Sequence, residues 1–412
     1  MTRGGFVKTS RLFTIPTSLF FVLALSCVYP THDNDRAAQL EEWHSVWQYL
    51  NVFSIYQDKI PPAPGKHSPE ELFDMISDSL GGIRYTEYVD DRLGWDDDDW
   101  DDWWDNIGFV WCGITSPIMT RSTLIFSIPT MHDCILDDFN YYMDFISGFQ
   151  NIVIDLRDNL GGYLDVAHHI LAEFLPYGTE YIHETGRYYD RELRQGFTES
   201  RKLKTTIKNP RLLNKNVAVL MNGNTASAAE ILASGMKDAH GAYLIGSQSY
   251  GKGIGAGEYK RTGRKTLRIT THGLSGISSR TGDYHKVGLV PDDVPEEYVI
   301  EAEPILRVRL DQAIERNPDV YGDLLDDTAA YEETLKYWLE DYSAIKMLDP
   351  SYTLPPLDPA PQGGMPKSAE WQRQEREIEA MALKAYRMAK RARTADLRPR
   401  GTIVRIEPDL LK

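Results

Sequence analysis

Cysteines and basic residues are both scarce in this chain. Three of its 412 residues are cysteines, and no Cys/His group has the spacing of a zinc site. There are 45 lysines and arginines against 61 aspartates and glutamates, a formal net charge of -16. Such a surface repels phosphate backbones and anionic lipids, which argues against nucleic-acid binding. The sequence contains no internal repeat and no motif for a metal ion or an organic cofactor, so we expect neither.

Long apolar runs are also missing, except near the N-terminus. There Arg3, Lys8 and Arg11 form a positively charged stretch, and residues 12–28 are mostly apolar. This apolar stretch is short for a membrane span, and no later segment of the sequence is a better candidate for one. The pattern is typical of an export signal, which we place at residues 1–27.

The end of this signal contains a cysteine. Leu23-Ala24-Leu25-Ser26-Cys27 resembles a bacterial lipobox, in which the cysteine becomes a lipid anchor, although Ala24 stands where leucine is usual. The alternative is an ordinary cleaved signal peptide. Both interpretations predict an exported protein, either a periplasmic or cell-envelope lipoprotein of a bacterium or a secreted one, with no membrane attachment beyond the lipid.

Acylation of Cys27 would leave two other cysteines. Cys112 and Cys134 could then form a disulfide in an oxidising compartment, and two buried free thiols are the alternative.

Residues 28–122 are expected to form an N-terminal helical region with an acidic loop. Apolar residues recur at three- and four-residue steps over 37–58, and Ser68-Pro69 begins a second helix that runs to about Leu80. The run at 96–106 carries seven acidic groups and suggests calcium binding. It lacks the glycine and the final glutamate of an EF-hand loop, which favours a solvated surface loop.

An α/β layered core is expected over 123–298. Apolar, β-branched segments at 151–156 and 217–221 predict buried strands, and amphipathic helices alternate with the strands. Residues 299–412 are expected to form a C-terminal helical extension, interrupted by a proline-rich linker at 349–366.

Two positions in this core suggest nucleophilic catalysis. Ser227 follows a buried strand and a turn, in the first turn of a helix, where unpaired N–H groups favour a developing oxyanion. Lys252 stands between Gly251 and Gly253 just after another strand, and a buried lysine can act as a base for a serine. The alternatives are a helix-capping serine and a solvated loop lysine.

Four segments resemble, in order, the signature blocks of the C-terminal-processing (tail-specific) serine peptidases. They are IVIDLRDNLGG (152–162), NGNTASAAEILASGMKDA (222–239), YLIGSQSYGKG (243–253) and VGLVPDD (287–293). The resemblance covers about 123–295 and implies a ClpP/crotonase-like layered core that acts on the C-terminal regions of proteins or peptides. It implies Ser227 as nucleophile and Lys252 as general base. It also implies an oxyanion hole from the N–H of Ala228 with one from Gly161 or Gly162, and a structural role for Asp238.

The chain departs from the family pattern in two ways. Ala256 occupies the position, four residues after the lysine, where the family has a glutamine that orients the amine. Tyr259 or a backbone carbonyl could replace that glutamine. A PDZ domain is also missing, because residues 82–122 are too few to form one.

Three other interpretations compete with the peptidase. The first is a catalytically weakened binding or scaffold protein on the same fold, which Ala256 favours. The second is a crotonase-like enzyme acting on acyl thioesters, which an export signal opposes. The third is a Ser-His-Asp triad that uses His240 or His272, but neither histidine has a supporting motif. The sequence contains no indicator of the oligomeric state.

Overall fold

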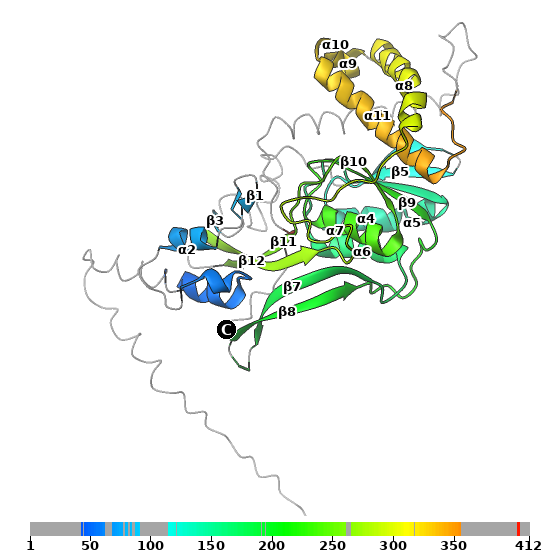
Figure 1. The fold of residues 1–412 in the computed structure, drawn as a ribbon. Coiled ribbons are helices and arrows are strands. Elements are labelled where there is room, and N and C mark those ends of the chain that lie inside the picture. Colours follow the sequence, from blue (N-terminus) through cyan, green and yellow to red (C-terminus); the bar gives the residue numbers. More distant parts are fainter. Residues whose placement is uncertain are drawn as a thin grey trace, which may run out of the picture.

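The computed structural model describes residues 43, 45–61, 68–76, 79–80, 83–84, 87–90, 114–120, 122–190, 192–193, 195–260, 265–316, 318–355 and 402–403. Within these residues the chain forms two large sheets with helices between and around them (Figure 1). The α/β layered fold expected from the sequence is confirmed.

The first sheet has five strands in the order β10-β9-β6-β5-β4. Its parallel part consists of β5 (Thr123–Ser127), β6 (Asn151–Asp155), β9 (Asn216–Met221) and β10 (Tyr243–Gly246). The antiparallel edge strand is β4 (Thr115–Met119). All five side chains of β6 are buried, as the continuous apolar run predicts for a strand that is covered on both faces.

Alternate residues of these strands face opposite layers. On one face, Ile152 and Ile154 pack with apolar side chains of the helices. These helices are α4 (Asp133–Tyr141), α5 (Met143–Ser147), α6 (Leu164–Phe174) and α7 (Ala228–Gly235). On the other face, Val153 lies in a second cluster with Ala344 and Ile345 of α11 (Thr328–Leu348). The sheet therefore lies between two helical layers.

The α11 helix belongs to the expected C-terminal extension. It packs against α8 (Glu296–Arg316), with the short helices α9 (Pro318–Tyr321) and α10 (Asp323–Asp326) between them. Figure 1 shows this hairpin, in yellow and orange, against the side of the sheet that lies away from α4, α6 and α7. The C-terminal end of α11 is thus part of the layered body, because Ala344 and Ile345 cover the central strands.

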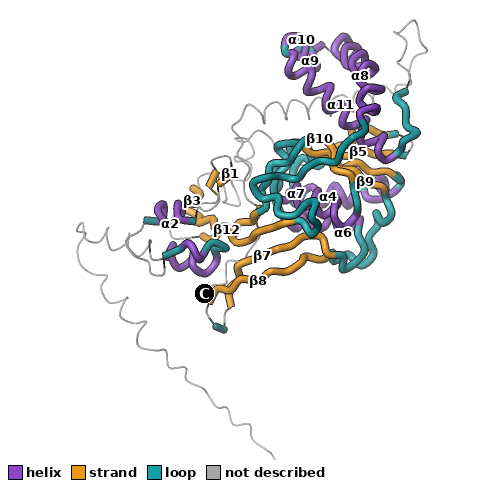
Figure 2. Tube along the Cα trace, viewed as in Figure 1, coloured by secondary structure: helices purple, strands orange, loops and turns teal. Residues whose placement is uncertain are grey.

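The second sheet is mainly antiparallel. It contains the long hairpin β7 (Glu180–Asp190) and β8 (Gln195–Lys204), with β11 (Ile254–Lys260) and β12 (Lys265–Ser275). Two short strands complete it, β3 (Glu87–Asp90) and β13 (Thr402–Ile403). Figure 2 shows the helices of the core between the two groups of strands. Tyr181 and Ile182 of β7 join the core cluster there.

The N-terminal region packs on this second sheet. Apolar side chains from helical residues 45–53 and from α2 (Pro69–Met75) form a cluster with Leu267 and Ile269 of β12. The 3-10 turn Gln57–Lys59 lies between them. Ser68 caps α2 with a capping box, as predicted.

Two expectations for the N-terminal region were wrong. The helix that begins after Ser68 ends at Met75 instead of near Leu80, because Ser79–Leu80 (β1) pairs with Ile83–Arg84 (β2). The region is also not purely helical, since β4 joins the core sheet from before residue 123. No helix within the described ranges is long and apolar enough to span a membrane. The predicted export signal at residues 1–27, with Cys27, and the acidic run at 96–106 lie outside those ranges.

Candidate active site

Ser227 lies at the N-cap of α7, after the turn that follows β9. Its backbone has φ 58° and ψ -120°, a left-handed conformation that is rare for residues other than glycine. Two backbone hydrogen bonds fix the residues directly before Ser227: Ala226 N–H donates to Asn159 O at 2.9 Å, and Tyr250 N–H donates to Thr225 O at 3.0 Å. Ser227 is fully buried. Such strain persists only where the surroundings over-determine it, and it is often found at functional positions.

The Gly161-Gly162 pair lies directly against this serine. Gly161 has φ +96°, and a Cβ on it would lie 2.7 Å from the Cβ of Ser227 and 3.0 Å from Ala228 N. Gly162 has φ +144°, and a Cβ there would collide with the backbone of Met131. Only glycine can therefore occupy either position, and the first lets a backbone segment approach the serine closely.

The N–H groups expected to form an oxyanion hole are not equivalent. The Gly161 N–H donates to Asn159 Oδ1 at 2.8 Å, so it is already satisfied. The Gly162 N–H donates to no backbone carbonyl within the described part of the chain. Ala228 is the first residue of α7, and an N–H at that position has no acceptor within its own helix. Ala228 and Gly162 are the better-placed pair.

Lys252 follows β10 and is 1 % exposed. The two glycines beside it let the chain pass between other backbone segments. A Cβ on Gly251, which has φ +91°, would lie 2.7 Å from Gly288 N, and one on Gly253 would lie 2.7 Å from Leu274 O. The lysine is therefore not a solvated loop residue, which was the alternative interpretation of its sequence context.

Glu230 connects the serine to the lysine. Its Oε2 accepts hydrogen bonds from the backbone N–H groups of Ser227 at 2.9 Å and Lys252 at 2.7 Å. Its Oε1 accepts from Ser249 Oγ at 2.5 Å and from Gly251 N–H at 2.7 Å. This fully buried carboxylate thus ties the start of α7 to the loop after β10.

The sequence reasoning did not single out Glu230. The signal was available, because a serine followed three residues later by glutamate is a capping-box pattern and this glutamate is the one charged residue of Ala228–Gly235. A buried acidic side chain needs several donors, which the two adjoining loops supply.

The electrostatics of the two polar residues follow from burial. Burial lowers the pKa of Lys252 well below its ordinary value, and the charge of Arg268 acts in the same direction, while Glu230 opposes both. Burial also raises the pKa of Glu230, against the effect of its four hydrogen bonds. A neutral amine can accept a proton, so the site can supply a base without a histidine.

Asp238, to which the family resemblance gives a structural role, has defined hydrogen-bond partners. Asp238, in the π-helical turn Met236–His240, accepts hydrogen bonds from the N–H groups of Ile277 and Ser278 and from the hydroxyl of Thr281. Its carboxylate thereby holds the loop after β12.

The two core histidines have other contacts. His240 packs edge-on against Phe174, and His272 Nδ1 lies 2.7 Å from Thr271 Oγ1. Burial lowers the pKa of each. Neither contact involves the serine, so a triad gains no support from them.

Ala256 and Cys134 also have defined surroundings. Ala256 is buried in β11 and pairs with Thr270, next to a bulge between Gly255 and Ala256. Cys134 takes part in a disulfide whose partner lies outside the described residues, as Cys112 does.

Comparison with known protein families matches this part of the chain. Residues 125–294 match the family described as Peptidase family S41, and they include Gly161, Ser227 and Lys252. Residues 125–294 are an S41 peptidase domain.

Curated relatives of this S41 domain are processing proteases. A carboxyl-terminal-processing protease of Synechocystis is 30% identical over 153 residues, which are 37% of this chain and 33% of that protein. The chloroplastic carboxyl-terminal-processing peptidase 1 of Arabidopsis thaliana is 36% identical over 107 residues, 26% of this chain and 20% of that protein. A carboxy-terminal-processing protease of Bartonella bacilliformis is 35% identical, over 35% of this chain and 31% of that protein. The matches thus span about a third of these relatives or less.

Solved structures that resemble the chain include a lipoprotein from Streptococcus agalactiae and a photosystem II D1 C-terminal processing protease. The first has a TM-score of 0.44 and 15% identity, covering 70% of this chain and 100% of that one. The second has a TM-score of 0.32 and 16% identity, covering 51% of this chain and 48% of that one.

Proposed function

We propose that this protein is a serine endopeptidase that cleaves protein or peptide substrates in their C-terminal regions through an acyl-enzyme. Ser227 is the nucleophile and Lys252 the general base. The observation that carries the proposal is the shared contact with Glu230, whose Oε2 accepts from the backbone N–H groups of both residues. One buried carboxylate thereby holds the two residues at the same edge of the sheet.

The first chemical step is acylation. Neutral Lys252 takes the hydroxyl proton of Ser227 as Oγ attacks the scissile carbonyl carbon. The negative charge moves to the carbonyl oxygen, where the N–H groups of Ala228 and Gly162 stabilise it. When the C–N bond breaks, Lys252 returns the proton to the leaving amine, which leaves the acyl group on Ser227.

Hydrolysis of the acyl-enzyme repeats these roles with water. Lys252 takes a proton from the water as its oxygen attacks the ester carbon, and the same N–H groups hold the oxyanion. The ester C–O bond then breaks and the proton returns to Ser227 Oγ. The new C-terminal carboxylic acid gives its remaining proton to the solvent and leaves as the carboxylate, and the free serine and neutral lysine are regenerated.

The substrate class comes from the curated relatives, whose names describe C-terminal processing. We also propose that the protein acts outside the cytoplasm, after export by residues 1–27, with an acylated Cys27 as its anchor. Cys27→Ser should then move the protein from the membrane fraction to the soluble fraction. A wild type that is already soluble in the periplasm or medium would exclude the anchor.

A second function, a binding or scaffold protein on the same fold, is favoured by Ala256. The family glutamine that orients the lysine is replaced there by a side chain with no hydrogen-bonding group. A poorly oriented base would weaken catalysis, while a substrate groove would still bind peptides.

A fluorophosphonate probe separates the two functions. The probe forms a bond to an activated serine, so the wild type should be labelled and Ser227→Ala should not. Lys252→Ala should label at least 100-fold more slowly, because general-base assistance typically contributes this much. Equal labelling of wild type and Ser227→Ala, or no labelling of folded wild type, would favour the binding function.

A further inference from the structure

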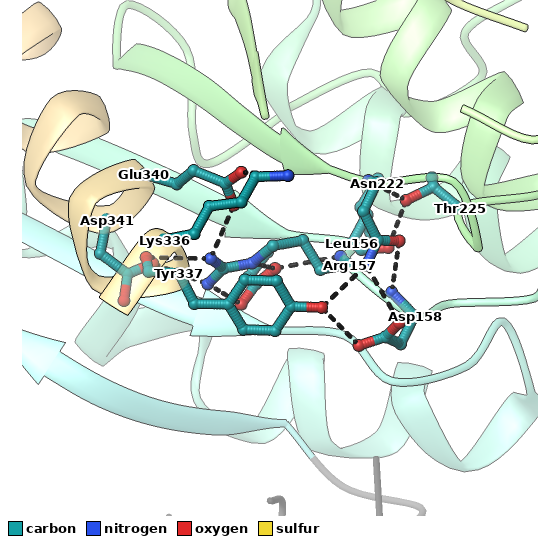
Figure 3. A network of polar contacts seen from close by, with 10 residues as sticks. Leu156, Arg157, Asp158, Asn222, Thr225, Lys336, Tyr337, Glu340 and Asp341 are labelled. Atoms are coloured by element: carbon teal, nitrogen blue, oxygen red, sulfur yellow. Dashed lines mark hydrogen bonds and ion pairs between the residues drawn. The ribbon is translucent and has the colours of Figure 1, made fainter. Parts of the chain in front are cut away.

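The α11 helix contacts the S41 domain through more than apolar packing. Tyr337, Glu340 and Asp341 share one face of this helix with Ala344, which lies on the sheet. The Tyr337 ring covers the guanidinium of Arg157, whose Cζ lies 4.4 Å from the ring centroid. Figure 3 shows this face of α11 against the residues that follow β6.

Arg157 anchors the helix. Its guanidinium donates to Asp155 in a bidentate pair at 2.9 and 2.8 Å, to Asp341 at 2.7 Å and to Glu340 at 3.1 Å. It also donates to the carbonyl oxygen of Tyr337 at 3.1 Å. Burial opposes its charge, but the three carboxylates outweigh this effect and raise the pKa of Arg157 well above its ordinary value. The position of Tyr337 along the sheet edge is therefore closely determined.

The hydroxyl group of Tyr337 lies between two turns of the core. It donates to Asp158 Oδ2 at 3.1 Å and accepts from Asn222 Nδ2 at 3.0 Å. Asp158 and Asn222 also bond to each other, with the Asp158 N–H donating to Asn222 Oδ1 at 3.0 Å. The same Asp158 accepts from Asn224 Nδ2 at 2.8 Å. Figure 3 shows the hydroxyl directed at both Asp158 and Asn222.

These two turns lead to the catalytic centre. Asp158 has a strained φ of 62° and stands three residues before Gly161. Asn222 begins the turn that ends at Ser227, and the Ala226 N–H binds Asn159 O across the gap between the turns. Since both turns contain residues in left-handed conformations, their geometry depends on the contacts that hold them.

We propose that Tyr337 is a positioning residue for the peptidase reaction: its hydroxyl holds the turn with Gly161-Gly162 in register with the turn that ends at Ser227. The inference rests on the proposed function, in which these turns supply the oxyanion hole and the nucleophile. It gives the C-terminal hairpin a role in catalysis, although that hairpin lies beyond the matched residues 125–294.

The test compares two tyrosine variants of α11 in the full chain. Tyr337→Phe removes the hydroxyl and keeps the ring over Arg157. Tyr331→Phe is the matched control, because its hydroxyl donates to Asp311 Oδ1 at 2.8 Å and its ring lies 5.7 Å from the Cζ of Arg307. The two substitutions thus remove equivalent groups at different places on one helix.

The first readout is the rate at which a fluorophosphonate probe labels Ser227, with casein hydrolysis as a second. Tyr337→Phe should label about tenfold more slowly, because a lost hydrogen bond to a charged group is worth 1.4 kcal/mol or more. Its kcat on casein should fall while KM changes little. Tyr331→Phe should match the wild type. Equal labelling of wild type and Tyr337→Phe would overturn the inference.

The second readout does not depend on activity. Amide hydrogen exchange over residues 157–162 and 222–229 should become faster in Tyr337→Phe and stay unchanged in Tyr331→Phe. Unchanged exchange in Tyr337→Phe would overturn the inference, even if the wild type is active. A folded wild type that does not label would instead overturn the proposed function, and faster exchange would then still support the positioning of the turns.

Discussion

Gly161 lies so close to Ser227 that a Cβ built on the glycine would stand 2.7 Å from the Cβ of the serine. The contact joins the turn after β6 to the N-terminus of α7, and it leaves no room for a side chain. Gly161, which stands 66 positions before Ser227 in the sequence, therefore packs against the backbone around the serine.

Gly161→Ala should abolish peptidase activity. The substitution adds the cost of a positive φ, about 1–2 kcal/mol, to a collision with Ser227 and Ala226. Gly178→Ala is the control, because Gly178 has φ +79° and nothing within 4 Å of its Cβ position. Thermal unfolding should show a small loss of stability in Gly178→Ala and a larger one in Gly161→Ala, and probe labelling of the folded fraction should be lost only in Gly161→Ala. Normal labelling of Gly161→Ala would contradict the close approach.

Peptidase activity should rise with pH through the pKa of Lys252. Burial lowers this pKa, and only the neutral amine accepts a proton, so activity reaches a plateau at a pH below the ordinary pKa of lysine, about 10.4. Lys252→Arg should be inactive at every pH, since arginine stays protonated. If the pH dependence of activity changes in His240→Ala or His272→Ala, the general base is a histidine.

The same shift affects stability in a defined direction. Between the lowered pKa of the folded state and about 10.4, the unfolded chain binds one proton more at Lys252. The contribution of this residue to the free energy of unfolding therefore rises with pH across that window. Lys252→Met should remove this dependence and raise the stability at neutral pH, measured by urea unfolding. A less stable Lys252→Met would contradict the costly burial of the amine.

Glu230→Gln should damage the protein despite its matching shape. Each carboxylate oxygen accepts from two donors, so an amide NH₂ in either place would face two donors and leave them unsatisfied. We expect a loss of about 2–5 kcal/mol and at least a hundredfold slower labelling of the folded fraction.

Glu173→Gln is the control. Glu173 is also a buried glutamate on a helix, but its hydrogen bonds come from Arg211 and not from the residues around Ser227. It should lower stability without changing the labelling rate of the folded fraction. Wild-type activity in Glu230→Gln would exclude Glu230 as the link between nucleophile and base.

The contribution of Asp341 to the free energy of unfolding should decrease as the pH rises from about 4 to 6. Burial raises its pKa from 3.8 to about 6, against the charge of Arg157, and Asp155 and Glu340 act with burial. Lys336 Nζ, 3.6 Å from Glu340 Oε1, adds a positive charge to this cluster. Between about pH 4 and 6 the folded chain holds one proton more, so this contribution to stability decreases by about 3 kcal/mol.

The measurement for this prediction is urea unfolding of wild type and Asp341→Asn at several pH values. The stability of the wild type minus that of the variant should decrease from pH 4 to pH 6 and then stay constant. A difference that rises with pH would show that the ion pair with Arg157 outweighs the burial of the carboxylate.

Some of the fold could be predicted because the signals are local. The run 151–156 carries three consecutive apolar, β-branched residues at 152–154, and a strand covered on both faces was predicted from them. The β7–β8 hairpin was missed, since nearly all side chains of β8 are exposed and no apolar alternation marks it. The helix after Ser68 was extended too far because Gly81-Gly82 was interpreted as a helix stop, although a Gly-Gly pair is also a local signal for the two-residue hairpin that pairs Leu80 with Ile83.

For the candidate site, the sequence by itself determined the chemical groups: a serine at a helix start, a lysine between glycines, and the glycine pair that precedes them. These depend on neighbours along the chain. Only the tertiary structure decided that Glu230 accepts from both Ser227 and Lys252, and that Tyr337 contacts Asp158 from 179 residues away. Both relationships arise where the ends of neighbouring strands and a covering helix meet. A polar group that is buried there costs free energy unless it is hydrogen-bonded, and its partner can be distant along the chain.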